Sequence, residues 1–161
     1  MPFSLFEDLK RPGFHSSIMT TFSVDPAFYD ANIQFRLRSF GCQNNLLLAD
    51  AAMLNQSLEQ ISDAFMHAER TYLIVPVSGR GCFHPKISLR YGQSKCRLLI
   101  GSGNATSAGW GSNRELISSI EWAQAGDLTE QSAQLRLIAK VHDWLVAQLP
   151  KPIDADLAYK L

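Results

Sequence analysis

Three short apolar runs between residues 17 and 77 alternate with two segments that show helical periodicity. The runs 17–23 (SIMTTFS), 45–49 (NLLLA) and 71–77 (TYLIVPV) are rich in leucine, β-branched and aromatic side chains, which is typical of strands. Residues 26–40 and 50–69 lie between these runs, and we expect a helix in each segment. Strands and helices that alternate with short connections predict an α/β layered domain.

Both expected helices carry local signals. Asp25 is suited to cap the first helix and Pro26 to occupy its first position, where a missing N–H does no harm. The apolar side chains of this helix are Phe28, Ile33 and Leu37, and it should stop near Gly41. The second helix runs on from Asp50, and its apolar stripe comprises Met53, Leu54, Leu58, Ile61 and Phe65.

Residues 83–91 show a different pattern, in which apolar and polar side chains alternate. Phe83, Pro85, Ile87, Leu89 and Tyr91 alternate with His84, Lys86, Ser88 and Arg90, as in a strand with one apolar and one polar face. A turn at 92–94 and an apolar run at 96–100 predict a hairpin. We expect another strand at 115–122 and a last helix at 129–149, ended by Pro150 and Pro152. The apolar stripe of that helix comprises Leu137, Val141, Trp144, Leu145 and Leu149.

The length of 161 residues and the hydrophobic content of 46% suit a single domain with a substantial core. Pro12 and Gly13 break the chain near its start, so we expect residues 1–15 to form a loosely held N-terminal segment. The domain then spans 16–149, and 150–161 form a tail or the start of a linker. Whether Leu161 is the natural C-terminus stays open at this stage.

The chain is electrically balanced, with 15 Lys and Arg residues against 15 Asp and Glu residues. It therefore lacks the overall basic surplus that proteins binding nucleic-acid backbones usually show. Five basic residues nevertheless gather within one segment, namely Arg80, Lys86, Arg90, Lys95 and Arg97. They suit equally a local nucleic-acid surface and the solvated edge of a hairpin, where basic side chains discourage strand pairing.

The three cysteines, Cys42, Cys82 and Cys96, are odd in number and lack C-x-x-C spacing. This distribution argues against a disulfide scaffold and a zinc site, and for a reducing compartment. The sequence shows neither the apolar core of a signal peptide nor an apolar run of membrane-spanning length. We therefore expect a cytoplasmic protein without a membrane partner.

Three short motifs hold polar groups that could act on a phosphoryl centre: Phe83-His84-Pro85-Lys86, Gly101-Ser102-Gly103-Asn104 and Asn113-Arg114-Glu115. His84 and Lys86 stand two apart in an expected strand, so both side chains should project from one face and reach one phosphate. The amide of Asn104 and the hydroxyl of Ser102 can donate hydrogen bonds to phosphate oxygens. Glu115 could accept a hydrogen bond from one ring nitrogen of His84 and leave the other nitrogen free as a nucleophile.

The order of these motifs resembles the phospholipase D superfamily, whose signature is H-x-K followed by G-S-x-N and usually by a later glutamate. The resemblance extends over about residues 16–123 and is to bacterial phospholipase D-like nuclease domains, including those attached to restriction or phage-defence proteins. It implies a phospholipase D-like layered domain with a mixed central sheet flanked by helices.

The same resemblance implies a metal-independent phosphodiesterase without a cofactor, most specifically a nuclease or endonuclease that cleaves DNA or RNA through a phosphohistidine intermediate. By position, His84 would be the nucleophile or the acid. Lys86 and Asn104 would clamp the phosphate, with Ser102 as a supporting donor. Glu115 would be the orienting carboxylate.

Three departures from the family pattern bear on these expectations, one of which is a gap to G-S-x-N that is longer than the commonest spacing and that a longer hairpin at 92–94 can absorb. Tyr91 stands where the family usually has an aspartate, and its place on the apolar face of the strand makes the change structural rather than chemical. The chain carries one H-x-K motif where the family's active site needs two. We therefore expect a homodimer with the active site at the interface, or one half of a longer protein. The alternative is a catalytically inactive module that binds nucleic acid or mediates dimerisation in a larger assembly.

Other assignments compete less well. Glu121 lies on the same expected strand face as Glu115, but Glu115 matches the family spacing more closely. His15, His67 and His142 lack a comparable context, and we expect them at the surface or at helix ends. A lipid substrate is disfavoured because no amphipathic membrane-docking segment is visible. DNA and RNA, single or double stranded, remain open as substrates.

Overall fold

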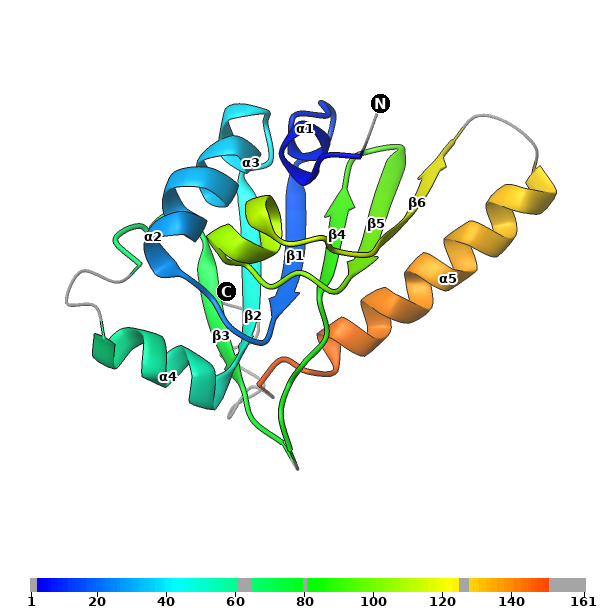
Figure 1. Cartoon of the computed structure of the whole chain (residues 1–161). Helices are drawn as coiled ribbons and strands as arrows, with labels where there is room; N and C mark the ends of the chain where they lie inside the picture. The colour runs from blue at the N-terminus through cyan, green and yellow to red at the C-terminus, as the bar shows by residue number, and fades with distance from the viewer. Residues whose placement is uncertain (1–2, 61–64, 80, 125–127, 151–161) are drawn as a thin grey trace.

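A mixed six-stranded sheet forms the centre of the protein, with the strand order β3-β2-β1-β4-β5-β6 (Figure 1). The computed structural model describes residues 3–60, 65–79, 81–124 and 128–150. Strands β1 (Ser16–Thr21), β2 (Asn44–Asp50) and β3 (Leu73–Val77) are parallel to one another. Strands β4 (Ile87–Tyr91), β5 (Lys95–Gly101) and β6 (Ile117–Ala123) form an antiparallel meander, and β4 joins it to β1. The predicted mixed sheet is confirmed.

Helices cover both faces of this sheet (Figure 1). One face packs against α1 (Leu5–Leu9) and a helical run made of α2 (Pro26–Phe28), the π-helical η1 (Tyr29–Gln34) and α3 (Phe35–Ser39). The other face packs against α5 (Leu128–Val146), whose Ile138 and Leu145 contact Leu89 and Leu98 of the meander. Helix α4 (Ala51–Gln60) follows β2 directly, and a short π-helical turn, η2 (Ala108–Ser112), interrupts the connection between β5 and β6.

The predicted start of the first long helix is confirmed in detail. The carboxylate of Asp25 accepts a hydrogen bond from the N–H of Phe28 at 3.0 Å, and Pro26 is the first helical residue. The helix ends just before Gly41, whose φ of +96° lies in the left-handed region that glycine adopts without strain. The six-residue π-helical segment in its middle has no counterpart in the sequence pattern, because apolar spacing does not distinguish α- from π-helical turns.

The strand predicted at 83–91 begins at Ile87, so this prediction is wrong for its first four residues. Pro85 lacks the N–H that a strand ladder requires, and the side chain of Thr20 takes the place of the ladder there. Its hydroxyl donates to the carbonyl oxygen of Pro85 and accepts from the N–H of Ile87, each at 2.9 Å. His84 and Lys86 therefore lie in an extended segment that enters the sheet, rather than in a strand.

The second predicted helix and the last one also differ from expectation. Residues 65–70 form turns rather than helix, and Phe65 and Glu69 have positive φ values of 55° and 59°; Ile61 lies outside the described residues. In α5, Leu137 and Trp144 are 43% and 42% exposed, so the predicted stripe is wrong at these positions. Ile138 and Leu145 are buried with the partly buried Val141 beside them, so Ile138 takes the place predicted for Leu137, and the prediction holds for Val141 and Leu145.

The N-terminal segment is held firmly, contrary to the prediction of a loose one. Asp8 of α1 is 3% exposed and forms ion pairs with Arg90 and Arg97, which are also buried. Arg97 additionally bonds Glu121 at 2.7 Å. Neither interpretation of the basic cluster fits the two arginines, because they face a buried carboxylate and not solvent or a ligand. Lys95 instead donates to the carbonyl oxygen of Pro12 at 2.6 Å; Arg80 lies outside the described residues.

Candidate active site

The three sequence motifs meet at one edge of the sheet. Strands β4 and β5 are antiparallel, so the segment before β4 lies beside the loop after β5. The N–H of Gly101 donates to the carbonyl oxygen of Lys86 at 2.9 Å, and the N–H of Ser102 donates to that of Leu116 at 3.1 Å. The end of β1 completes the site through residues 21–23. All five side chains that the sequence singles out therefore lie in one region, on the connection that leads into β4 and the connection from β5 to β6.

His84 and Lys86 are in direct contact. The Nζ atom of Lys86 lies 2.7 Å from Nδ1 and 3.0 Å from Nε2 of His84, and it donates to the carbonyl oxygen of His84 at 2.9 Å. The ring of Phe22 lies 4.6 Å from the imidazole, centroid to centroid, and 5.7 Å from Nζ of Lys86. His84 itself is exposed, whereas Lys86 is buried. A ligand can therefore reach the imidazole while the ammonium group stands beside it.

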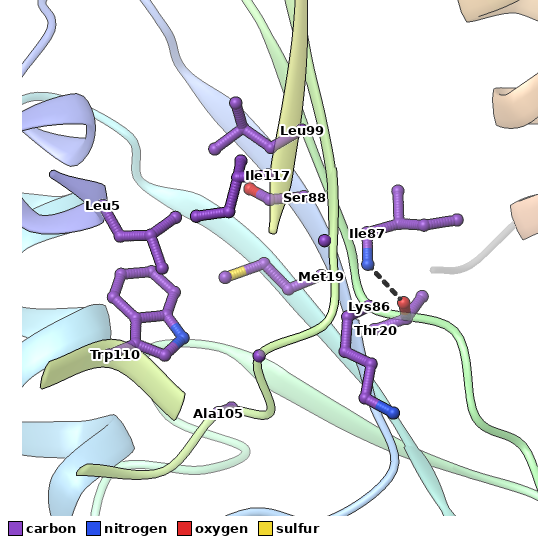
Figure 2. A pocket seen from close by; sticks show the side chains of 12 residues that line it. Leu5, Met19, Thr20, Lys86, Ile87, Ser88, Leu99, Ala105, Trp110 and Ile117 are labelled. Carbon is purple, nitrogen blue, oxygen red and sulfur yellow. Dashed lines mark hydrogen bonds between the residues drawn. The ribbon is translucent and has the colours of Figure 1, made fainter. Parts of the chain in front are cut away.

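Burial sets the electrostatics of Lys86. It lowers the pKa of the amine below the ordinary lysine value, and the nearby Cys82 and Glu115 oppose this effect only in part. Behind the segment lies a small cavity of about 40 Å³, walled by Leu5, Met19, Trp110 and Ile117 among others. Figure 2 shows the ammonium end of Lys86 pointing away from Met19 and Trp110. The stem of Lys86 thus borders the apolar cavity, while its ammonium is directed away from it, toward His84 and the ring of Phe22.

Asn104 is oriented by main-chain donors. Its Oδ1 atom accepts from the N–H groups of Phe22 at 3.3 Å and Ser23 at 3.4 Å. Within the residues that the structure describes, no acceptor is paired with its amide nitrogen. The NH₂ group is thus left to donate to a ligand. Gly109 of η2 packs closely against the main chain of Asn104. A Cβ at position 109 would lie 2.7 Å from the main-chain nitrogen of Asn104.

Glu115 has partners other than the one predicted. Its carboxylate accepts a hydrogen bond from the hydroxyl of Ser102 and another from Nδ2 of Asn113 at 3.2 Å. The Ser102 hydroxyl oxygen in turn accepts from the N–H of Leu116 at 3.0 Å. No hydrogen bond joins Glu115 to His84 in the described part of the chain. Because Ser102 has a single proton, it can donate to a phosphate only by giving up its bond to Glu115.

Three residues around the site escaped the sequence interpretation. Phe22 lay within a predicted strand, and nothing in its pattern marks a ring beside a histidine. Thr20, which fixes the approach to β4, looked like any β-branched strand residue. Asp50 carried only the signal of a helix start, yet one of its oxygens accepts from the N–H of Phe83 at 2.7 Å. These contacts join residues at least 33 positions apart, so local sequence patterns could not reveal them.

Two further properties of the described residues bear on the site. No three His, Cys, Asp or Glu side chains among them are grouped so as to hold a metal ion. None of the helices within the described ranges combines the length and the apolar character needed to cross a membrane.

Comparison with family models gives no match, and comparison with curated proteins gives none either. Solved structures do match. NucT from Helicobacter pylori is 15% identical with a TM-score of 0.59, covering 88% of this chain and 85% of that one. The phospholipase D family member Nuc from Salmonella typhimurium is 14% identical with a TM-score of 0.58, covering 89% and 84%.

A mutant of yeast tyrosyl-DNA phosphodiesterase also matches, with 14% identity and a TM-score of 0.54. The match covers 78% of this chain but only 31% of the yeast protein, so the chain spans about a third of that length. These likenesses show that the chain has the fold seen in phospholipase D family members, as the sequence motifs predicted.

Proposed function

From the phospholipase D-like fold and its edge site, we propose that the chain is a metal-independent phosphodiesterase that cleaves nucleic acid, with His84 as nucleophile. The observation that carries the proposal is the contact of Lys86 with His84 at 2.7 Å, with Asn104 bonded through its oxygen to the main chain of Phe22, whose ring lies against His84. The solved structure of tyrosyl-DNA phosphodiesterase, which has the same fold, supports a phosphodiester substrate. DNA and RNA both remain within the proposal.

In this mechanism a ring nitrogen of His84 attacks phosphorus and the bond to the leaving oxygen breaks. Lys86 and the Asn104 amide stabilise the charge that develops on the non-bridging oxygens, which is the usual role of preorganised donors. A second acid protonates the leaving oxygen. Water then attacks the phosphohistidine, releases the phosphate monoester and restores the imidazole.

We propose that the second acid comes from another copy of the chain, since the other histidines of this chain have partners elsewhere. His15 bonds Ser16 at the start of β1 at 2.7 Å, and His142 of α5 lies against Tyr91. His67 lines a cavity beside η1 and α3. None of these contacts involves His84, Lys86 or Asn104. We therefore propose a two-fold dimer in which His84 of the partner subunit is the acid.

Exposed apolar side chains support a contact at this edge. Leu116, next to Glu115, is 82% exposed, and Ile100 at the end of β5 is 42% exposed. Apolar side chains exposed beside polar site residues are typical of surfaces that bind another protein. Glu115 stays the proposed orienting carboxylate. To accept a hydrogen bond from His84 of its own chain, the Glu115 carboxylate has to give up the hydrogen bond that it accepts from Ser102.

The decisive test is cleavage of labelled DNA and RNA oligonucleotides in EDTA. We expect wild-type protein to cleave and His84→Ala to be inactive, with His15→Ala, which changes an exposed and remote histidine, as the matched control. Acid-labile labelling of His84 by a phosphodiester substrate should accompany turnover. Cleavage that requires Mg²⁺, or that survives His84→Ala, would contradict the mechanism. Binding without any cleavage would identify an inactive module.

A further inference from the structure

The side chain of Asp50 joins the start of helix α4 to the segment that carries His84. It is the last residue of β2, directly before α4, and it is 6% exposed. One oxygen, Oδ1, accepts from the N–H groups of Ala52 and Met53, each at 3.1 Å, and so caps α4. The other, Oδ2, accepts from the N–H of Phe83 at 2.7 Å. A single buried carboxylate thus holds three main-chain donors from two connections.

The carboxylate of Asp50 is held in its charged form. Burial alone would raise the pKa of Asp50, but the N–H groups of Phe83, Met53 and Ala52, together with the nearby His84, lower it below the ordinary aspartate value. A short hydrogen bond to a charged acceptor is among the stronger ones in proteins.

The segment 83–86 depends on such contacts because it lies outside the strand ladder. Asp50 holds its first N–H, and Thr20 holds the carbonyl oxygen of Pro85 and the N–H of Ile87 at its end. His84 stands between these two points. Its exposed ring therefore takes its position from the main chain, with Phe22 and Lys86 as its side-chain contacts.

We propose that Asp50 is the positioning residue of the nucleophile: its buried carboxylate fixes the main chain at Phe83 and so sets where the imidazole of His84 stands relative to Lys86 and Asn104. The inference rests on the proposed function for its effect on catalysis. Its structural part, the control of His84 by Asp50, can be measured without any activity.

The Asp50→Asn variant separates positioning from capping. Asparagine caps helices about as well as aspartate, so α4 keeps its cap through the amide oxygen. The amide nitrogen then faces the N–H of Phe83, and two donors repel. We expect kcat to fall by about 10- to 100-fold, as small displacements of reacting groups do, with little change in KM or Tm.

Asp25→Asn is the matched control, because it makes the same change at another helix cap. Asp25 accepts from the N–H of Phe28 at 3.0 Å and its side chain makes no bond to the segment of His84. It should keep wild-type kcat. Equal kcat in Asp50→Asn and wild type would overturn the positioning role.

Nuclear magnetic resonance supplies the readout that does not need turnover. In Asp50→Asn, the amide proton of Phe83 should move upfield and exchange faster, and the His84 ring signals, assigned by their loss in His84→Ala, should shift. Signals of His15, His67 and His142 should stay in place. Unchanged Phe83 and His84 signals would overturn the inference even in an active protein.

The two proposals can fail separately. A wild-type protein without cleavage, but with the expected shifts in Asp50→Asn, would refute the proposed function and leave the control of His84 by Asp50 supported. If Asp50→Asn does not fold, hydrogen exchange in the wild-type protein still tests the inference. Slow exchange of the Phe83 amide proton would support its hydrogen bond to Asp50. Exchange as fast as in an unfolded chain would overturn the inference.

Discussion

The chemistry at the residue scale depends on which polar groups face solvent. Lys86 and Arg90 are four positions apart in the sequence, yet the ammonium of Lys86 stands beside an exposed imidazole while Arg90 is 1% exposed and paired with Asp8. Asn104 shows the same division within one side chain, since its oxygen is bonded to main-chain donors and its nitrogen is left to donate. The proposed phosphate site is therefore built from few groups, each held by a specific neighbour.

A first prediction concerns the pH dependence of Lys86. Because burial lowers the pKa of its amine, the ammonium loses its proton at a lower pH than an ordinary lysine. If this charge stabilises the reacting phosphate, activity should fall as the pH rises. The fall should come at a pH below the ordinary lysine pKa of about 10.4. The measurement is kcat against pH.

Lys86→Arg is the informative variant for this prediction, because a guanidinium stays protonated throughout that range. Its residual activity should persist to higher pH than that of wild type. An alkaline fall at the same pH in both proteins would assign the titration to another group.

At the element scale, two irregular segments carry the site. The segment before β4 departs from the ladder at Pro85, and the connection from β5 to β6 winds into the π-helical turn η2. Trp110 of that turn packs against Phe6 of α1 at 5.5 Å between ring centroids. Helix α1 thus supports the loop that presents Asn104 and Glu115, and it is itself held by the ion pairs of Asp8.

A second prediction tests the packing of η2 against Asn104. Gly109→Ala places a methyl group 2.7 Å from the main-chain nitrogen of Asn104, so the loop has to shift and the amide should move off the phosphate. We expect cleavage to fall at least tenfold, while the Lys86–His84 contact remains. Gly111→Ala, in the same turn, has nothing within 4 Å of its new methyl group and should be neutral. Equal rates for the two variants would show that the approach of Gly109 is not required.

A third prediction concerns the anchor of α1. Asp8→Asn leaves Arg90 buried without its charged partner and Arg97 with Glu121 alone, so the free energy of unfolding should fall by about 3–5 kcal/mol. Glu7→Ala removes the neighbouring pair with Lys10, which is exposed, and should cost about 1 kcal/mol or less. Urea denaturation of the two variants measures both values. A loss for Asp8→Asn no larger than that for Glu7→Ala would mean that the buried network contributes little.

At the scale of the whole molecule, the sheet joins two halves with different tasks. The parallel strands β1 and β2 bring Thr20 and Asp50 to the site. The segment that leads into β4 carries His84 and Lys86, and the connection from β5 to β6 carries Asn104 and Glu115. The antiparallel pairing of β1 with β4 brings these parts together. One chain then holds one imidazole at this edge, and the proposed reaction needs two.

A fourth prediction follows for assembly. Leu116→Asp puts a charge on the exposed apolar edge beside Glu115, and in a two-fold contact it would place like charges opposite each other. The dimer should dissociate and cleavage should be lost together, as measured by analytical ultracentrifugation and by the EDTA assay. Leu137→Asp, at an exposed position of α5, should change neither. A wild-type protein that stays monomeric while it cleaves would refute the dimer.

Much of this protein follows from its sequence alone. The apolar runs and the cap at Asp25 determine local structure, because strand and helix patterns depend on neighbours within a few positions. The three motifs identified the side chains that meet at the edge of the sheet. Sequence periodicity, however, treated Arg90 and Lys86 as equivalent members of one polar face.

Only the tertiary structure decided which partner each polar group has. Asp8 lies 82 positions from Arg90, Asp50 lies 33 positions from Phe83, and Glu115 bonds Ser102 instead of His84. Such pairings depend on strand order and on which helix covers which face, and no local pattern records them. Burial then makes each pairing consequential, since a polar group removed from water must find its partner inside the fold.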